Sequence, residues 1–483
     1  MLPAPIDYTT NVLKGSLGYF DDQTSLKLAY QSSFFMNNLK AVTWENPFDD
    51  NSSRGDLGSV SLAPDNQMHQ LAFSGVHTLS GTTRLTGNAT FSGMFQDDDF
   101  LPDSVDPTLT NTLPRNSLDG EVYQTNALLA LTSRPVSGLN LKASYRMQKR
   151  DNDTPVDTYR YYVNDRDTVG ATGGPSEDTN TPYSYDKRTT ELSGGYRINK
   201  QARLSGGVSR ETYECSTCEV DKTTEDEGKL SLRLTPDYDV QVTLKGSVSS
   251  RDGSYYNTLT GENPLLRKYN IADRDRTQAG MNVSYQPTDK LALSANLDYS
   301  DDDYDDSLVG LQSSNQSSLS VDVSYQHSDK LSSHAYIARE IIESEQAGSQ
   351  VPNSADWFID NEDTVDSLGF GVKWQKSPKL DIGVDYVYSG SEGETDFSSL
   401  NAVPPVSQFP DLKSDLHSLK LYADYQWHPK TSVKLSYLYE KFDADDWSND
   451  GVNVDTIPEV LLLGEENPSY EEHLIGVSLI TRF

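Results

Sequence analysis

The stretch that decides the fold is Tyr285-Gln-Pro-Thr-Asp-Lys-Leu-Ala-Leu-Ser-Ala-Asn-Leu-Asp-Tyr299. Its Pro-Thr-Asp-Lys segment is a tight turn, and apolar and polar residues alternate after it from Leu291 to Tyr299. Because successive side chains of a strand point to opposite faces, this alternation predicts a β-strand with one apolar and one polar face. Nearly every strand in the chain repeats the pattern with aromatic residues at its ends, which indicates that the apolar face meets lipid.

The composition agrees with a membrane β-barrel. The 483 residues carry a net charge of -33, which argues against a nucleic-acid partner because such proteins neutralise phosphates with cations. The 28 tyrosines and 14 phenylalanines argue against disorder. A barrel explains the low mean hydropathy, since only alternate strand residues touch lipid. No signal peptide precedes the first predicted strand, so we expect a mature or shortened form of the protein.

Short and long connections alternate along the chain. Tight turns are predicted near Asp21–Gln23, Ser80–Thr82, Pro135–Gly138, Asn199–Ala202, Pro236–Asp239, Pro287–Lys290, Ser328–Lys330, Lys376–Lys379 and His428–Thr431. Long polar loops lie between them, among them Glu345–Asn361 and Ser391–Asp411. Outer-membrane barrels have this asymmetry, with short periplasmic turns and long extracellular loops. We therefore predict a single all-β domain over residues 1–483, a large antiparallel transmembrane β-barrel in the bacterial outer membrane.

The segments before the tight turns resemble one another. Ser284-Tyr-Gln-Pro-Thr-Asp-Lys-Leu, Ser324-Tyr-Gln-His-Ser-Asp-Lys-Leu and Lys373-Trp-Gln-Lys-Ser-Pro-Lys-Leu align, and Asp424-Tyr-Gln-Trp-His-Pro-Lys is close. Each predicts one hairpin, and together they place Tyr285, Tyr325, Trp374 and Trp427 in an aromatic girdle at the periplasmic interface.

Two strands for each of the nine turns, plus the final segment from His473 to Phe483, give about nineteen to twenty strands. A terminal aromatic residue on an alternating last strand resembles the signal by which outer-membrane proteins are recognised. Because bacterial single-chain barrels close with an even number of strands, either one strand is overlooked or an N-terminal part is missing, and we favour the second interpretation.

The first hundred residues carry the most distinctive motifs. Ser33-Phe-Phe-Met-Asn-Asn38 precedes Thr43-Trp-Glu-Asn-Pro-Phe48, then Leu62-Ala-Pro-Asp-Asn66 with His69, then Phe95-Gln-Asp-Asp-Asp-Phe-Leu-Pro102. This order, with Pro468-Ser-Tyr-Glu-Glu-His473, resembles the MtrB/PioB family of outer-membrane barrels that accompany decaheme cytochromes. The matching motif residues are Trp44, Glu45, Asn46, Pro47, Phe48, Asp65 and Asn66. The Cys-x-x-Cys that MtrB-type members carry near the N-terminus is not found before Cys215.

The resemblance implies a sheath of up to about 26 strands for a periplasmic decaheme c-type cytochrome, which passes electrons across the outer membrane to an extracellular multihaem cytochrome or another acceptor. Strands about 4.8 Å apart and tilted by about 40° give about twenty strands a backbone diameter near 40 Å, which leaves roughly 20–30 Å of lumen. Such a bore admits a rod of stacked haems. It is too wide for a selective pore unless it is plugged.

The alternation also predicts which residues face the lumen. We expect polar side chains of the strands that follow residue 290 to contact the cytochrome by hydrated packing and electrostatic orientation, without chemistry of their own: Asn296, Asp298, Asp322, Asp381, Asp385, Lys420, Asp424, Lys434 and Glu440.

The two cysteines, Cys215 and Cys218, admit three interpretations: a disulfide at the rim, a redox-active pair or part of a metal site. Glu219 follows them in place of the histidine that c-type haem attachment needs, so the chain is expected to carry no cofactor of its own, and haem belongs to the partner.

Acidic clusters lie where strands enter loops, at 97–99, at 301–306 and at 443–446. Oxygen-rich loops could hold loosely bound Ca²⁺, and a solvated acidic rim explains the same pattern; no defined metal site is predicted. His69 is interpreted either as a lumen hydrogen-bond donor or as an ordinary strand residue.

Three alternatives to a cytochrome sheath differ in class. A porin-like or substrate-specific diffusion channel would have the same barrel. An outer-membrane phospholipase would need a serine nucleophile with a histidine base, and no such motif stands out. A soluble β-repeat adhesin would bury its aromatic residues in a core. We expect a non-catalytic protein in contact with outer-membrane lipid.

Overall fold

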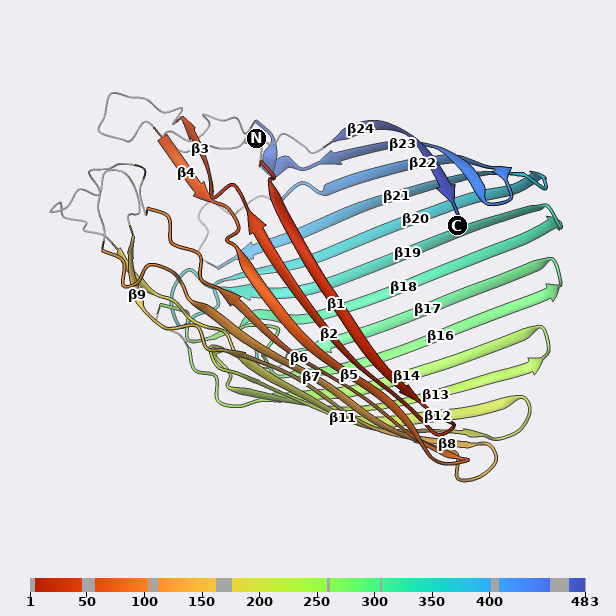
Figure 1. Cartoon of the computed structure of the whole chain (residues 1–483), viewed down its shortest axis with the longest axis horizontal. Coiled ribbons are helices and arrows are strands. Elements are labelled where there is room, and N and C mark those ends of the chain that lie inside the picture. Colours follow the sequence, from red (N-terminus) through yellow and green to blue (C-terminus); the bar gives the residue numbers. More distant parts are fainter. Residues whose placement is uncertain are drawn as a thin grey trace.

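The computed structural model describes residues 5–45, 57–102, 105, 112–161, 176–258, 261–304, 306–400, 408–451 and 469–482. Within these residues the main sheet has 20 strands, of which β15 has two residues and the other 19 are long. Each long strand pairs antiparallel with the next long strand along the chain, so the sheet is a continuous meander. Figure 1 shows these strands side by side around a curved wall.

The first long strands are β1 (Tyr8–Phe20), β2 (Thr24–Asn37), β5 (Asn66–Ser80), β6 (Thr83–Gln96), β7 (Gly120–Ser133), β8 (Leu139–Asn152), β11 (Tyr185–Arg197), β12 (Ala202–Cys215), β13 (Lys222–Asp237) and β14 (Val240–Gly253). They continue as β16 (Arg274–Thr288), β17 (Leu291–Asp303), β18 (Val309–Ser328), β19 (Leu331–Gly348), β20 (Trp357–Ser377), β21 (Leu380–Ser399), β22 (Leu412–His428), β23 (Thr431–Asp445) and β24 (Tyr470–Thr481).

The shorter elements lie in the long connections. Two hairpins, β3 (Ala41–Glu45) with β4 (Leu57–Ser61) and β9 (Thr158–Tyr161) with β10 (Ser176–Thr179), stand at the end of the wall opposite the tight turns (Figure 1). β15 (Leu266–Arg267) pairs in parallel with the start of β18, and a 3-10 turn spans Trp447–Asn449. No helix in the described part of the chain is long and apolar enough to cross a bilayer.

All nine predicted tight turns join neighbouring long strands, and the predicted number of about nineteen long strands is confirmed. The predicted limits of two loops are wrong: the Glu345–Asn361 loop is shorter because β19 extends to Gly348 and β20 begins at Trp357, and the Ser391–Asp411 loop is shorter because β21 extends to Ser399. These strands continue because cross-strand pairing satisfies the backbone whatever the side chains are. Polar residues there mark the end of the apolar band, and the strands continue beyond it.

The wall has two open edges among the described residues. β1 pairs with β2, β24 pairs with β23, and no pairing between β1 and β24 is found in these residues. Tyr8 lies opposite Asn37 at the loop end of the wall, whereas Thr481 lies opposite Thr431 at the turn end. The predicted C-terminal aromatic, Phe483, falls outside the described residues.

The outward face carries a continuous apolar band. On β21 it runs from Leu380 to Tyr388, a span of about 26 Å along the strand and about 20 Å of depth at a tilt of about 40°, close to the band of outer-membrane barrels. Charged residues such as Glu392 follow towards the loops. Tyr285, Tyr325, Trp374 and Trp427 all lie on this outward face near the turns and are 38%, 40%, 44% and 69% exposed. The predicted alternation of faces is therefore present in the structure.

Candidate functional site on the inner face of the sheet

The inner face of the wall is polar, and the strand register assigns its residues. Residues directly opposite each other on neighbouring strands share a face, so charged side chains that pair with each other across one pocket fix the orientation of whole cross-strand rows. A pocket of about 990 Å³ lies against the turn-side half of β5–β18 and is lined by Arg84, Lys142, Glu191, Lys229, Lys245 and Asp298, among others. These residues define the inner face.

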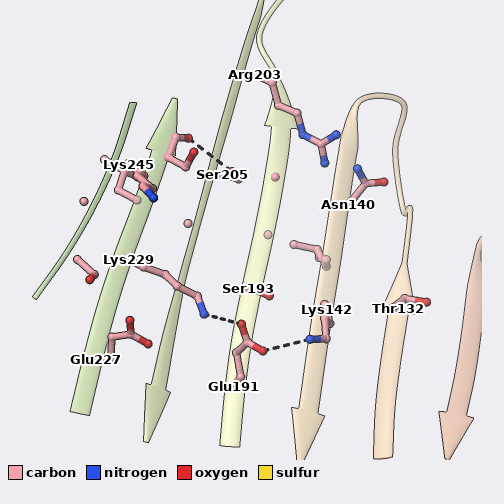
Figure 2. Close-up of a pocket in the computed structure, with 18 of the residues that line it drawn as sticks. Thr132, Asn140, Lys142, Glu191, Ser193, Arg203, Ser205, Glu227, Lys229 and Lys245 are labelled. Atoms are coloured by element: carbon pink, nitrogen blue, oxygen red, sulfur yellow. Dashed lines mark hydrogen bonds and ion pairs between the residues drawn. The ribbon is translucent and has the colours of Figure 1, made fainter. Parts of the chain in front are cut away.

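Ion pairs cross this pocket (Figure 2). The Glu191 carboxylate accepts a hydrogen bond from Lys142 Nζ at 3.1 Å, and its other oxygen lies 2.9 Å from Lys229 Nζ. Lys245 Nζ lies 2.6 Å from Asp298 Oδ1. These ion pairs form two separate groups, one that joins β8, β11 and β13 and one that joins β14 to β17, and both stabilise the inner wall.

Three of the nine predicted lumen residues lie on β17 and β18. Asn296 donates to Ser320 Oγ at 3.1 Å, and Asp322 accepts from Ser294 Oγ at 3.2 Å. Asp298, paired with Lys245, shares this inner face. All three hydrogen-bond within the wall, so they stabilise the polar surface that they line.

The other six lie together on β21–β23. Asp381 stands opposite Asp424, which stands opposite Lys434; Asp385 stands opposite Lys420; and Glu440 accepts a hydrogen bond from the Tyr470 hydroxyl at 2.6 Å. Their faces match those of the pocket residues through the continuous register. The nine residues therefore share one face in two groups, and their contact with a cytochrome stays a prediction.

Sequence reasoning missed the basic residues of the earlier strands. Arg197, Arg203 and Arg233 lie opposite one another on β11, β12 and β13, close to the tight turns. Counting in twos from each predicted turn would have placed them on the polar face, because the alternation holds there too. The opposition of three arginines could not be read without the register.

The connection between β14 and β16 folds against the loop-side end of the inner face. Arg251 donates to the carbonyl of Ala272 at 2.8 Å and to that of Tyr269 at 2.6 Å. Ala272 is 3% exposed. Gly310 at the start of β18 has φ 124°, and a Cβ there would lie 2.3 Å from the Arg267 carbonyl oxygen, so only glycine permits the parallel pairing with β15. This connection therefore covers part of the inner face at its loop-side end.

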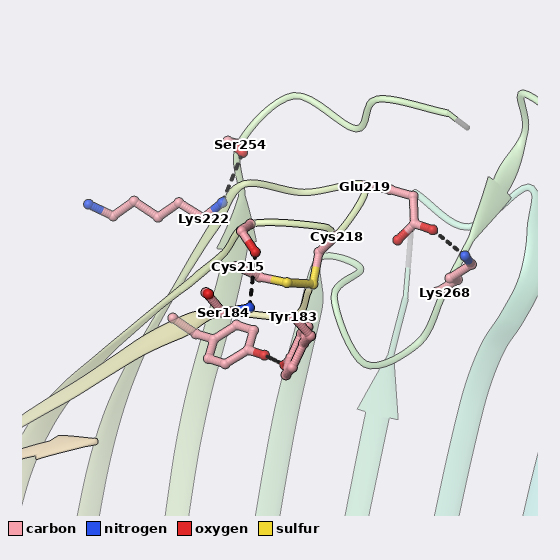
Figure 3. The surroundings of a disulfide bond; sticks show 10 residues. Tyr183, Ser184, Cys215, Cys218, Glu219, Lys222, Ser254 and Lys268 are labelled. Carbon is pink, nitrogen blue, oxygen red and sulfur yellow. Dashed lines mark hydrogen bonds and ion pairs between the residues drawn. A yellow bond between two sulfur atoms is a disulfide. The ribbon is translucent and has the colours of Figure 1, made fainter. Parts of the chain in front are cut away.

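A disulfide joins Cys215 at the end of β12 to Cys218, with the two Cα atoms 5.5 Å apart (Figure 3). The neighbouring Glu219 is 5% exposed and pairs with Lys268 from the β14–β16 connection. Lys268 also lies 2.7 Å from Glu262, and these two carboxylates raise the pKa of its ammonium above the ordinary value. The disulfide constrains the β12–β13 loop, and the ion pair between Glu219 and Lys268 attaches the β14–β16 connection to this loop at the rim.

The predicted motif residues that the structure describes lie at the loop-side rim. Asp65 accepts a hydrogen bond from the Asn37 amide at 2.7 Å and pairs with Lys40 at 3.2 Å. Lys40 also pairs with Asp98 at 2.5 Å, which raises the pKa of Lys40 and lowers that of Asp98. This cluster joins the ends of β2, β5 and β6.

The other motif residues lie near this cluster in sequence. Asn66 begins β5 and donates to the Pro64 carbonyl. Trp44 and Glu45 belong to the β3–β4 hairpin, where the Trp44 ring covers Gly58. Asn46, Pro47 and Phe48 fall outside the described residues.

His69 faces outward, so the lumen interpretation of this residue is wrong. Its Nδ1 lies 2.8 Å from the Tyr30 hydroxyl, and its ring packs against Phe34. Asp302 in one acidic cluster pairs with Arg276, and Asp443 in another lies 2.5 Å from Lys441. Cations of the chain itself therefore neutralise part of these clusters.

One group of three carboxylates in the described residues brings its ligand atoms within 4.8 Å: Glu392, Glu394 and Asp411. Lys413 Nζ lies 2.5 Å from a carboxylate oxygen of Glu392 and 3.3 Å from one of Asp411, so a side chain of the protein itself forms ion pairs with two of the three carboxylates. Loosely bound Ca²⁺ stays a prediction.

Comparison with known proteins agrees with this architecture. A family model described as "Putative outer membrane beta-barrel porin, MtrB/PioB" matches residues 1–483. The chain is 29% identical over 485 residues to "Outer membrane protein MtrB" of Shewanella baltica (strain OS185), covering 99% of this chain and 68% of that protein.

Solved structures show likeness of fold only. The siderophore receptor PiuA from Acinetobacter baumannii matches with a TM-score of 0.50 at 12% identity, covering 90% of this chain and 72% of that one. The FrpB iron transporter from Neisseria meningitidis (F5-1 variant) has a TM-score of 0.47 at 10% identity, covering 89% and 77%. With a family match over its whole length, the chain belongs to the MtrB/PioB family of outer-membrane β-barrel proteins.

Proposed function

We propose that this barrel holds a periplasmic decaheme c-type cytochrome in its lumen and positions it for electron transfer across the outer membrane. The observation that carries the proposal is family membership over residues 1–483 together with an inner face lined by paired charges. A hydrated, charged wall fits the surface of a soluble protein, and the outward apolar band faces the lipid, so the sheet separates the lumen from the bilayer. The barrel itself acts as a non-catalytic scaffold.

The electron carriers belong to the partner. The sequence has two cysteines, which are bonded to each other, and Cys-x-x-Cys-His does not occur, so the chain offers no covalent attachment for c-type haem. An extracellular multihaem cytochrome or another acceptor would receive the electrons at the long loops, opposite the tight turns.

The test is purification of the full-length protein from its own host in detergent, followed by haem staining and measurement of electron transfer to an external acceptor in a deletion strain. We expect a multihaem cytochrome in stoichiometric amount and loss of transfer on deletion. Absence of haem from barrel purified under mild conditions would falsify the proposal.

A diffusion channel is the second candidate, favoured by the porin description of the family and by the open pocket on the inner wall. Purified barrel without a partner would then conduct ions in a planar bilayer, and the intact cell envelope would admit solutes through it. A barrel that conducts alone but is sealed when haem protein co-purifies supports the scaffold.

A further inference from the structure

The inner wall is divided by charge. Over β6–β14 its turn-side half presents mainly cations, among them Arg84, Lys142, Arg203, Lys229, Arg233 and Lys245. Over β17–β23 the corresponding positions have an excess of anions over cations: Asp298, Asp322, Asp381, Asp385 and Asp424 share this face with Lys373, Lys420 and Lys434. In a chain with a net charge of -33, the basic part is a local exception.

The basic part includes a row of arginines that repel one another. Arg197 stands opposite Arg203 on the next strand, and Arg203 stands opposite Arg233 on the strand after that. Neighbouring strands lie about 4.8 Å apart, and like charges directly opposite each other destabilise a sheet. Within the described part of the chain no carboxylate forms an ion pair with any of these three side chains. Such a row is stabilised when an external anion covers it.

The acidic part has the complementary feature. Asp381 stands opposite Asp424, and Asp381 Oδ1 is buried without a hydrogen-bond partner among the described residues. Lys434, opposite Asp424, lies 5.7 Å from the centre of the Tyr422 ring. An ammonium or guanidinium group placed over this pair would reduce the repulsion between its two carboxylates.

We propose that the arginine row and the cations beside it form a docking surface for the carboxylate-rich face of the cytochrome in the lumen, while β21–β23 receive its basic face. This inference rests on the proposed function. Haem propionates and acidic side chains supply the carboxylates, and Arg203 lines the pocket that would receive them. Because opposite walls attract opposite faces, charge fixes the rotation of the cytochrome about the lumen axis.

The test uses the full-length barrel with its partner. Arg203→Glu with Arg233→Glu reverses the row, and Lys200→Glu with Lys290→Glu makes the same charge change in the tight turns at the same end of the wall. At moderate ionic strength we expect the haem retained per barrel to fall by about tenfold or more in the arginine variant. The turn variant should retain as much haem as wild type. Arg203→Lys with Arg233→Lys should keep most of the haem.

A second measurement does not depend on the folding of a variant. Haem should leave the wild-type complex progressively as salt is raised, because the contact is ionic. Retention of haem by a folded charge-reversal variant, or release from wild type that does not respond to salt, overturns the inference. Wild-type barrel without haem overturns the proposed function instead.

Discussion

The Tyr386 hydroxyl lies 2.8 Å from Nδ1 of His417 across β21 and β22. The same contact at the same distance joins Tyr30 to His69 and Tyr437 to His473. All three pairs lie on the outward face at the loop-side limit of the apolar band, where amphipathic rings anchor barrels at an interface. The outward face therefore has a tyrosine–histidine girdle on one side and the turn-side aromatic girdle on the other.

Loss of one such hydrogen bond should destabilise the barrel measurably. Tyr386→Phe keeps the ring and removes only the hydroxyl, so we expect a loss of about 1 kcal/mol in unfolding free energy in lipid vesicles. Urea unfolding followed by tryptophan fluorescence measures it. His417→Leu should cost a similar amount, and unchanged stability of both variants would show that the contact does not anchor the strand.

Docking of the β14–β16 connection should depend on pH through Asp273. Burial raises the pKa of this carboxyl, and Asp306 and Asp252 add to the rise, although its Oδ1 accepts a 2.6 Å hydrogen bond from the Gly253 amide. The charged form is thus disfavoured in the folded state, so docking weakens as pH rises through the raised pKa and strengthens as pH falls. Hydrogen exchange of the Gly253 amide between pH 4 and 7 measures this trend.

The matched variant for this prediction is Asp273→Asn, which keeps the acceptor oxygen and cannot ionise. This variant should reduce the pH dependence of docking and increase the protection of the Gly253 amide from hydrogen exchange at neutral pH. If the protection of the Gly253 amide changes with pH equally in wild type and variant, another group causes the titration.

Removal of the disulfide should loosen the rim and leave the strands paired. Cys215 and Cys218 are three residues apart, so the cross-link closes a very short loop and contributes about 2 kcal/mol in the chain-entropy model. We expect Cys215→Ser with Cys218→Ser to speed protease cleavage near 216–221 while heat-modifiable migration of the folded barrel persists. Loss of the folded band would show that the disulfide is needed for assembly.

Gly383 on the inner wall leaves room for an aromatic ring. A Cβ there would lie 2.2 Å from Tyr422 Cζ on the facing strand, so Gly383→Ala should push Tyr422 off the wall and into the lumen. Single-channel conductance of the partner-free barrel should fall, and adding Tyr422→Ala should restore it. Gly228→Ala on the outward face, where a Cβ meets nothing within 4 Å, controls for the added methyl group and should leave conductance unchanged.

Much of the fold follows from the sequence because its signals are local. The Pro287–Lys290 turn and the alternation from Leu291 to Tyr299 predict a hairpin and the orientation of each side chain, since both depend on neighbouring residues alone. The same rule put Asp298 and Asp424 on one face. It failed at Ser391–Asp411, where polar residues continue the strand β21 beyond the apolar band.

By itself the sequence determined the strands, their tight turns and the two faces, because the alternation of apolar and polar side chains depends only on consecutive residues. Only the tertiary structure brought Arg203 opposite Arg233, bonded His417 to Tyr386 and folded the β14–β16 connection onto Arg251. These relationships depend on the register of strands that are distant in sequence, and register is set by the whole sheet. The charge division of the inner wall is a property of that register.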